Sequence, residues 1–115
     1  MLKVLEVEAD LLEARSAATE ASGAEMITVA LRRVDFSKPR EQNVLGAIPK
    51  GMTVLPNTAG CHSLQEAITT AEMAREVFET DWIKLELIGD DYTIQPDTLQ
   101  LPQAAERLIK SGFRV

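Results

Sequence analysis

Four strand-like segments recur along this chain at nearly even spacing, and this recurrence limits the folds open to it. Their centres fall near Val29, Val54, Leu85 and Val115, which lie 25 to 31 residues apart. A strand, a crossover helix and the next parallel strand fit within that length. The spacing therefore predicts an α/β fold built of parallel (βα) units, in which right-handed crossovers place successive strands side by side.

Helix and turn signals lie between these strands. Asp10 with Glu13 starts one helix, which ends at Gly23, and Ser63 with Glu66 forms a capping box that starts another. Pro56 lacks a backbone donor and is expected to close its strand. We expect strands at 2–8, 26–31, 52–55, 82–88 and from 113, a helical turn at 43–48, helices after Asp10, after Ser63 and at 102–110, and polar loops at 32–43 and 89–97.

The segment 82–88 has two chemically different faces. Its odd-numbered side chains are aliphatic, whereas Lys84 and Glu86 share the other face with Trp82 and Ile88. In a sheet with one solvent-exposed face, Lys84 and Glu86 form an exposed, weak ion pair. In a parallel barrel the same face points into the lumen, where burying two charges is costly unless they have a function. Periodicity leaves both interpretations open.

Inside a lumen, Lys84 and Glu86 suit carbonyl chemistry. Desolvation can lower a lysine pKa from about 10.4, which leaves a neutral amine able to form an imine with a carbonyl substrate. Glu86 follows on the same face, roughly 6–7 Å away by strand rise, and is placed for proton transfer on a lysine-bound intermediate. The pair is therefore the candidate catalytic site if the sheet is a barrel.

Two features favour part of a (β/α)8 TIM barrel over a small open sheet. The chain reaches the start of a strand at residues 113–115, and the lumen-type face of 82–88 stays half built if nothing covers it. A complete barrel of about 250 residues carries its active site at the carboxyl ends of the strands. We expect residues 1–115 to form a single partial (β/α)-barrel domain, about half of a TIM barrel, with residues 1–15 as an atypical N-terminal segment.

Charge and cysteine content narrow the function classes. The net charge is -6, and the longest basic cluster is the pair Arg32-Arg33, so the chain is not expected to bind nucleic acid. No apolar run approaches the roughly 20 residues that span a bilayer. Cys61 cannot form an internal disulfide, which is typical of the cytosol. Cys61 and His62 are too few ligands for a zinc site, and no metal is expected.

Other polar residues near strand ends have two interpretations each. Asn57, at the start of a loop of small residues, either contacts a substrate or forms an Asx turn. Arg32-Arg33 follow a strand and either bind a phosphate or form an exposed pair. His62 is expected to be a loop residue beside a helix cap rather than a general base, and Asp90-Asp91 are expected to lie in a solvated loop.

Several segments, in order and with their spacing intact, resemble one enzyme family. They are Glu20-Ala21-Ser22-Gly23-Ala24-Glu25, Thr28-Val29-Ala30-Leu31-Arg32-Arg33-Val34, Leu55-Pro56-Asn57-Thr58-Ala59-Gly60, Thr80-Asp81-Trp82-Ile83-Lys84-Leu85-Glu86-Leu87-Ile88-Gly89-Asp90-Asp91 and Ala104-Ala105-Glu106-Arg107-Leu108. Together they are similar to bacterial thiazole synthase, which assembles the thiazole ring of thiamine. The resemblance covers about residues 16–115.

The resemblance implies a transferase on a (β/α)8 barrel. Lys84 matches the family lysine that forms an imine with 1-deoxy-D-xylulose 5-phosphate, and Glu86 matches an acid/base of the following rearrangement. Sulfur is expected as a thiocarboxylate on a small ubiquitin-like carrier protein, and dehydroglycine supplies the nitrogen and the remaining carbon. The family works as cytoplasmic homo-oligomers without a metal or a bound organic cofactor.

Two parts of the family pattern have no counterpart in this sequence. Residues 1–15 do not match the family's N-terminal strand and glycine-rich turn, and nothing corresponds to its later catalytic aspartate and phosphate loops. The chain is therefore expected to be a fragment, a piece of a split enzyme or a derived half-barrel, and to be inactive alone. The alternatives are an inactive half-barrel that self-associates or binds a partner, and a lysine-imine enzyme of aldolase type.

Overall fold

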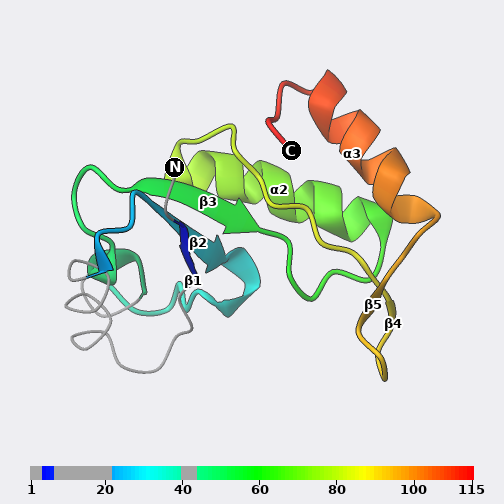
Figure 1. Ribbon diagram of the computed structural model, residues 1–115, viewed down its shortest axis with the longest axis horizontal. Helices are drawn as coiled ribbons and strands as arrows, with labels where there is room; N and C mark the ends of the chain where they lie inside the picture. Colours follow the sequence, from blue (N-terminus) through cyan, green and yellow to red (C-terminus); the bar gives the residue numbers. More distant parts are fainter. Residues whose placement is uncertain (1–3, 7–21, 40–43) are drawn as a thin grey trace. The chain divides into compact units, whose positions relative to one another are not determined.

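The computed structural model describes residues 4–6, 22–39 and 44–115 (Figure 1). The chain divides into two compact units, one of Met1–Val29 with Arg33–Leu55 and one of Ala30–Arg32 with Pro56–Val115. Strand β3, Thr53–Asn57, begins in the first unit and ends in the second. The described chain is of the α/β class with parallel strand pairing, as the sequence predicts.

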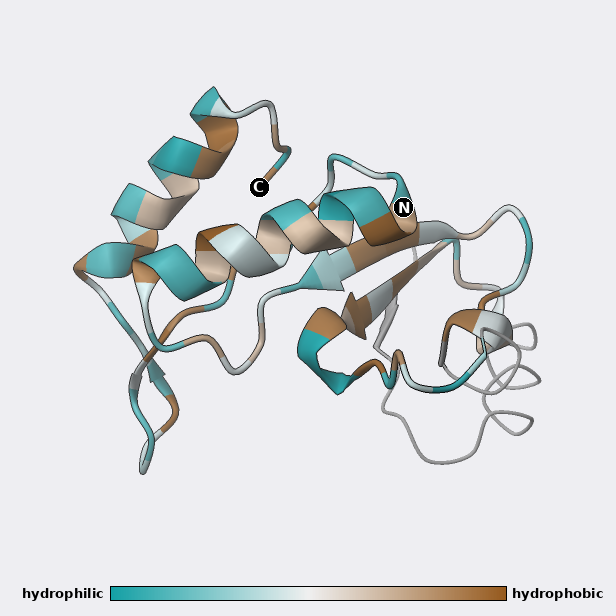
Figure 2. Ribbon diagram, turned by 180° about the vertical axis from the view of Figure 1, so that it is seen from behind, coloured by the Kyte–Doolittle hydropathy of each residue, from teal (hydrophilic) through white to brown (hydrophobic). Residues whose placement is uncertain are grey.

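The first unit holds a three-stranded sheet in the order β1-β2-β3. Strand β1, Val4–Glu6, runs parallel to β2, Met26–Ala30, with Val4 opposite Met26. Four of the five residues of β2 are buried, and the strand is hydrophobic along most of its length (Figure 2). Residues of both orientations are buried, so the predicted strand is covered on both faces, as is typical of parallel sheets.

Short helical turns and a residue with a left-handed backbone conformation occur between the strands of the first unit. Gly23 adopts φ 68°, the left-handed conformation expected of a helix end, while the helix predicted before it lies outside the described residues. The 3₁₀ helix η3, Val44–Ala47, confirms the predicted helical turn. A second 3₁₀ helix, η1 at Leu31–Arg33, forms where the predicted polar loop begins, and its first two residues belong to the second unit.

The second unit is built on helix α2, Leu64–Phe78, which the sequence predicts closely. Ser63 Oγ accepts a hydrogen bond from the Glu66 N–H at 3.1 Å, as the capping box requires. The Glu66 carboxylate accepts from the His62 N–H at 3.0 Å instead of from Ser63, one residue earlier than the standard pattern. Donors at this helix end are therefore satisfied by side chains.

A β-hairpin precedes helix α3 and corrects the predicted polar loop. Strand β4, Ile88–Asp90, pairs antiparallel with β5, Gln95–Pro96. The Asp90 carboxylate accepts from the Tyr92 N–H at 2.9 Å, which closes the turn and lowers the pKa of Asp90. The Ile94 N–H also donates to the Asp90 carbonyl at 2.8 Å across the same turn. Turn chemistry of this kind leaves no hydrophobic alternation, so periodicity alone misses the hairpin.

Helix α3, Gln100–Lys110, begins two residues before the predicted start at Pro102. Asp97 explains the earlier start, because its Oδ1 accepts from the N–H groups of Leu99 and Gln100 at 3.0 and 2.8 Å. The bonds to Gln100 and Leu99 also lower the pKa of this carboxyl. Gly112 ends the helix at φ 90°, as predicted.

Residues 82–84 lie between two parallel neighbours within the second unit. Lys84 bridges to Asn57 on one side, and Trp82 bridges to Arg114 on the other. The Lys84 N–H donates to the Pro56 carbonyl at 2.8 Å, so the proline still contributes an acceptor. The prediction that Pro56 closes its strand is therefore wrong. The segment 82–88 is also not one uninterrupted strand, since Ile88 belongs to β4.

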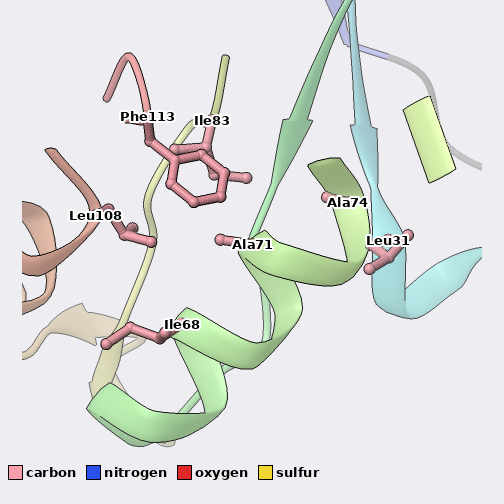
Figure 3. Packing of buried hydrophobic residues seen from close by; sticks show 7 residues of the cluster. All are labelled: Leu31, Ile68, Ala71, Ala74, Ile83, Leu108 and Phe113. Atoms are coloured by element: carbon pink, nitrogen blue, oxygen red, sulfur yellow. The ribbon is translucent and has the colours of Figure 1, made fainter. Parts of the chain in front are cut away.

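A hydrophobic cluster holds the second unit together (Figure 3). Ile68 and Ala71 of α2 point toward Leu108 of α3, and Ile83 and Phe113 pack beside them. The helices α2 and α3 lie side by side in this unit (Figure 1). The buried residues of the cluster are Leu31, Ile68, Ala71, Ala74, Ile83, Leu108 and Phe113.

Replacement of Ile83 tests how far this cluster stabilises the fold. Ile83 is 1% exposed, so Ile83→Ala removes packed methylene groups and leaves a cavity. The free energy of unfolding is expected to fall by about 2–5 kcal/mol in urea denaturation of the full protein that carries this sequence. The matched control is Ile109→Ala on α3, whose side chain is 60% exposed, with an expected change within about 0.5 kcal/mol. Equal losses in the two variants would contradict the assignment.

Candidate active site

Lys84 and Glu86 lie side by side on one face of the segment that follows β3 in the sheet. Their Nζ and Oε1 atoms are 3.7 Å apart, and the side chains are 43% and 39% exposed. The neighbours Ile83 and Leu87 are buried on the opposite face. The predicted division of this segment into an aliphatic face and a Lys/Glu face is confirmed for these residues.

The pair places an amine beside a carboxylate. An amine attacks a carbonyl, and a carboxylate within a few ångströms can then move protons on the bound intermediate. Both side chains are half-exposed among the described residues. This geometry suits imine chemistry, whereas an exposed ion pair of this kind adds little stability.

Asn57 sits at the carboxyl end of β3, where it bridges to Lys84. The residue is 4% exposed, and its Oδ1 accepts from the Ala59 N–H at 3.1 Å. This is an Asx turn, one of the two roles foreseen for it. Contact of Asn57 with a substrate stays a prediction.

Thr58 connects this turn to Glu86 and is the residue that sequence reasoning missed. Its side chain is fully buried at 0% exposure. The hydroxyl donates to the Glu86 carbonyl at 2.7 Å and accepts from the Glu86 N–H at 2.8 Å. No spacing rule marks a threonine for this role, since the bond pattern depends on where the loop turns.

Arg32 is engaged by groups of its own unit. Its Nη1 lies 2.8 Å from Glu66 Oε1, and the same nitrogen donates to the Gly60 carbonyl. Gly60 has φ 86°, a left-handed conformation that a side chain would strain. Arg32 therefore ties the loop after β3 to the start of α2, and phosphate binding by Arg32-Arg33 stays a prediction.

His62 and Cys61 occupy the same loop. His62 Nε2 lies 2.5 Å from Asp91 Oδ1, and both side chains are exposed. Cys61 is buried, with its Sγ 3.4 Å from Thr70 Oγ1. Within the described ranges, no three His, Cys, Asp or Glu side chains are grouped to hold a metal ion. Among the same residues, no helix has the length and apolar character to cross a membrane.

Comparison with known proteins links this geometry to one family. The model of the family "Thiazole biosynthesis protein ThiG" matches residues 8–115. A thiazole synthase of Cupriavidus metallidurans is 60% identical over 106 residues, which cover 86% of this chain and 38% of the relative. Thiazole synthases of Ralstonia nicotianae and Neisseria meningitidis are 61% and 63% identical, over 85% and 78% of this chain and 36% and 35% of the relatives.

The extent of the match corrects the prediction for the N-terminal residues and identifies the family of the chain. The chain spans somewhat over a third of the length of these curated relatives. The match begins at residue 8, so the prediction that residues 1–15 fall outside the family is wrong for residues 8–15. Since nearly the whole sequence matches the family model, the chain belongs to the ThiG family of thiazole biosynthesis proteins.

Proposed function

We propose that the protein carrying this chain is a thiazole synthase in which Lys84 forms an imine with 1-deoxy-D-xylulose 5-phosphate. The family membership supports the activity, and the 3.7 Å separation of Lys84 Nζ and Glu86 Oε1 is the observation that carries the assignment of residues. Attack of the neutral amine on the ketone carbon and loss of water give the imine, which is protonated at nitrogen. No metal is needed for this step.

Glu86 acts as the proton-transfer group of the proposed reaction. A protonated imine acidifies the C–H bonds of the adjacent carbon. The Glu86 carboxylate takes that proton, and the electron pair of the C–H bond moves toward the nitrogen to give an enamine. The carboxylic acid then returns the proton to another atom of the intermediate during the rearrangement. Asn57 is a proposed substrate contact through its place beside Lys84.

The remaining parts of the proposal concern the rest of the protein. The parallel (βα) units are proposed to form about half of a (β/α)8 TIM barrel, with residues 1–115 as one partial domain. Lys84 is 43% exposed, and further barrel strands of the whole protein are proposed to cover it. A cytoplasmic homo-oligomer is proposed to take sulfur from a ubiquitin-like carrier protein and nitrogen from dehydroglycine.

Product formation tests this function. The full protein that carries this sequence is incubated with the pentulose phosphate, dehydroglycine and a thiocarboxylated carrier protein, and thiazole phosphate is measured by mass spectrometry. We expect product with all three reactants and none when the carrier is replaced by its carboxylate form. Absence of product with the complete mixture would contradict the proposal.

A second candidate function is a non-catalytic module that self-associates or binds a partner. The observation that favours it is a group of exposed apolar side chains near the hairpin, with Tyr92 99%, Leu99 79% and Ile94 72% exposed. Exposed apolar groups of this kind mark interaction surfaces. Borohydride trapping combined with sedimentation analysis separates the two functions. A stable dimer without any imine adduct supports the module, whereas an adduct supports the enzyme whatever its oligomeric state.

A further inference from the structure

The hydroxyl of Thr58 replaces a main-chain partner in the sheet. In a parallel ladder, the Thr58 N–H would donate to Lys84 and the Thr58 carbonyl would accept from Glu86. The first bond is present, at 3.2 Å to the Lys84 carbonyl. The second is absent, because the chain turns after Asn57 and the Thr58 carbonyl accepts from the Cys61 N–H at 3.2 Å instead. The Thr58 side chain supplies the missing acceptor.

Because its hydroxyl takes the place of the backbone carbonyl, Thr58 is the main hydrogen-bond partner of the Glu86 backbone. A hydroxyl has one donor hydrogen and two acceptor lone pairs, so it can bind the N–H and the carbonyl of Glu86 at once. Those bonds measure 2.8 and 2.7 Å, and Thr58 is fully buried. Lys84 is held separately, by its own N–H to the Pro56 carbonyl and its carbonyl to the Thr58 N–H. Loss of the hydroxyl is therefore expected to disturb the position of Glu86 more than that of Lys84.

We propose that Thr58 is a positioning residue that sets the Glu86 carboxylate relative to the Lys84 amine for proton transfer. This inference rests on the proposed function, since it assumes that Lys84 carries the imine. Small displacements of a catalytic group cost up to about 10²-fold in rate. Loss of the hydroxyl is therefore expected to slow the step that uses Glu86, while the formation of the imine on Lys84 largely persists.

The test compares three proteins: the full protein that carries this sequence, Thr58→Val and Thr58→Ser. Imine formation is measured by borohydride trapping with 1-deoxy-D-xylulose 5-phosphate. Proton transfer is measured as deuterium incorporation from D2O at the carbon beside the imine carbon. For Thr58→Val we expect trapping within about threefold of the parent and deuterium incorporation about 10- to 100-fold slower. Thr58→Ser keeps the hydroxyl, so it is expected to restore deuterium incorporation to within about threefold.

Amide hydrogen exchange at Glu86 provides a readout that is independent of catalysis. Exchange is expected to be slow in the parent and in Thr58→Ser, and faster in Thr58→Val, because only Val lacks the acceptor. An adduct in Thr58→Val with unchanged deuterium incorporation contradicts the positioning role alone. Absence of an adduct in the parent contradicts the proposed function, and the positioning role with it. Loss of trapping and of proton transfer together in a folded Thr58→Val also overturns the inference.

Discussion

Lys84→Ala is expected to abolish the borohydride-trapped adduct with 1-deoxy-D-xylulose 5-phosphate. Only a primary amine forms the imine, and the proposed mechanism places that amine on Lys84. Lys84→Arg is expected to lose the adduct as well, although it keeps a positive charge beside Glu86, since a guanidinium stays protonated in proteins. The measurement is the intact mass of the full protein that carries this sequence, after reduction with and without the sugar phosphate.

Lys110 offers a matched control for this experiment. It also forms an ion pair with a glutamate, with Nζ 2.7 Å from Glu106 Oε1, but it lies on α3 and is 72% exposed. Lys110→Ala is expected to leave the yield of adduct unchanged. If both alanine variants retain the adduct, the amine that reacts is not Lys84, and the assignment of the nucleophile fails.

Glu86→Gln is expected to separate imine formation from the steps that follow it. The amide keeps the size of the carboxylate but cannot accept a proton, so thiazole phosphate formation should fall by about 10²- to 10⁴-fold. Trapping of the imine on Lys84 should persist in the same variant. The measurements are the rate of product formation and the yield of reduced adduct, both on the full protein.

Glu106→Gln is the control for this second prediction. It removes a carboxylate paired with a lysine in the same way, at an exposed position on α3. Product formation is expected to stay within about twofold of the parent, because most exposed substitutions of this kind have small effects. Normal product formation by Glu86→Gln would rule out Glu86 as the proton-transfer group.

Repeating patterns account for the parts of the fold that the sequence predicts well. Helix α2 has a capping residue at Ser63 and apolar residues at helical spacing, so both its start and its buried side follow from the sequence. The burial of β2 and the buried and open faces of residues 83–87 follow from similar arguments. These features depend on local spacing, which a single sequence contains.

Structural features that depend on a partner far away in the sequence cannot be predicted from local sequence patterns. Pro56 was expected to close its strand, yet its carbonyl accepts from Lys84, 28 residues further on. The two bonds of the Thr58 hydroxyl to Glu86 also join residues 28 apart. The hairpin of β4 and β5 is closed by side-chain bonds of Asp90 within a polar stretch. Each of these depends on tertiary placement or turn chemistry rather than on hydrophobic period.

The candidate site also has features that follow from the sequence and features that only the structure shows. Alternation along a strand places Lys84 and Glu86 together, and the structure bears this out with a 3.7 Å separation. The chemical role proposed for them rests on the resemblance to a family, because the geometry of an exposed Lys–Glu pair fits an inert ion pair equally well. The sequence offers the Asx turn at Asn57 as one of two roles, and the structure shows that it forms. The ion pair of Arg32 with Glu66 is visible only in the folded chain.

Peptide mapping of the reduced adduct tests the central claim most directly. Trypsin cleaves after Arg75, Lys84 and Arg107, so the unmodified protein yields separate peptides 76–84 and 85–107. A reduced imine on Lys84 blocks cleavage there. We predict that the added mass appears on the joined peptide 76–107 and that fragmentation places it on Lys84. Added mass on a peptide that contains Lys38, Lys50 or Lys110 as an uncleaved internal residue, with 76–84 and 85–107 unmodified, would contradict the account.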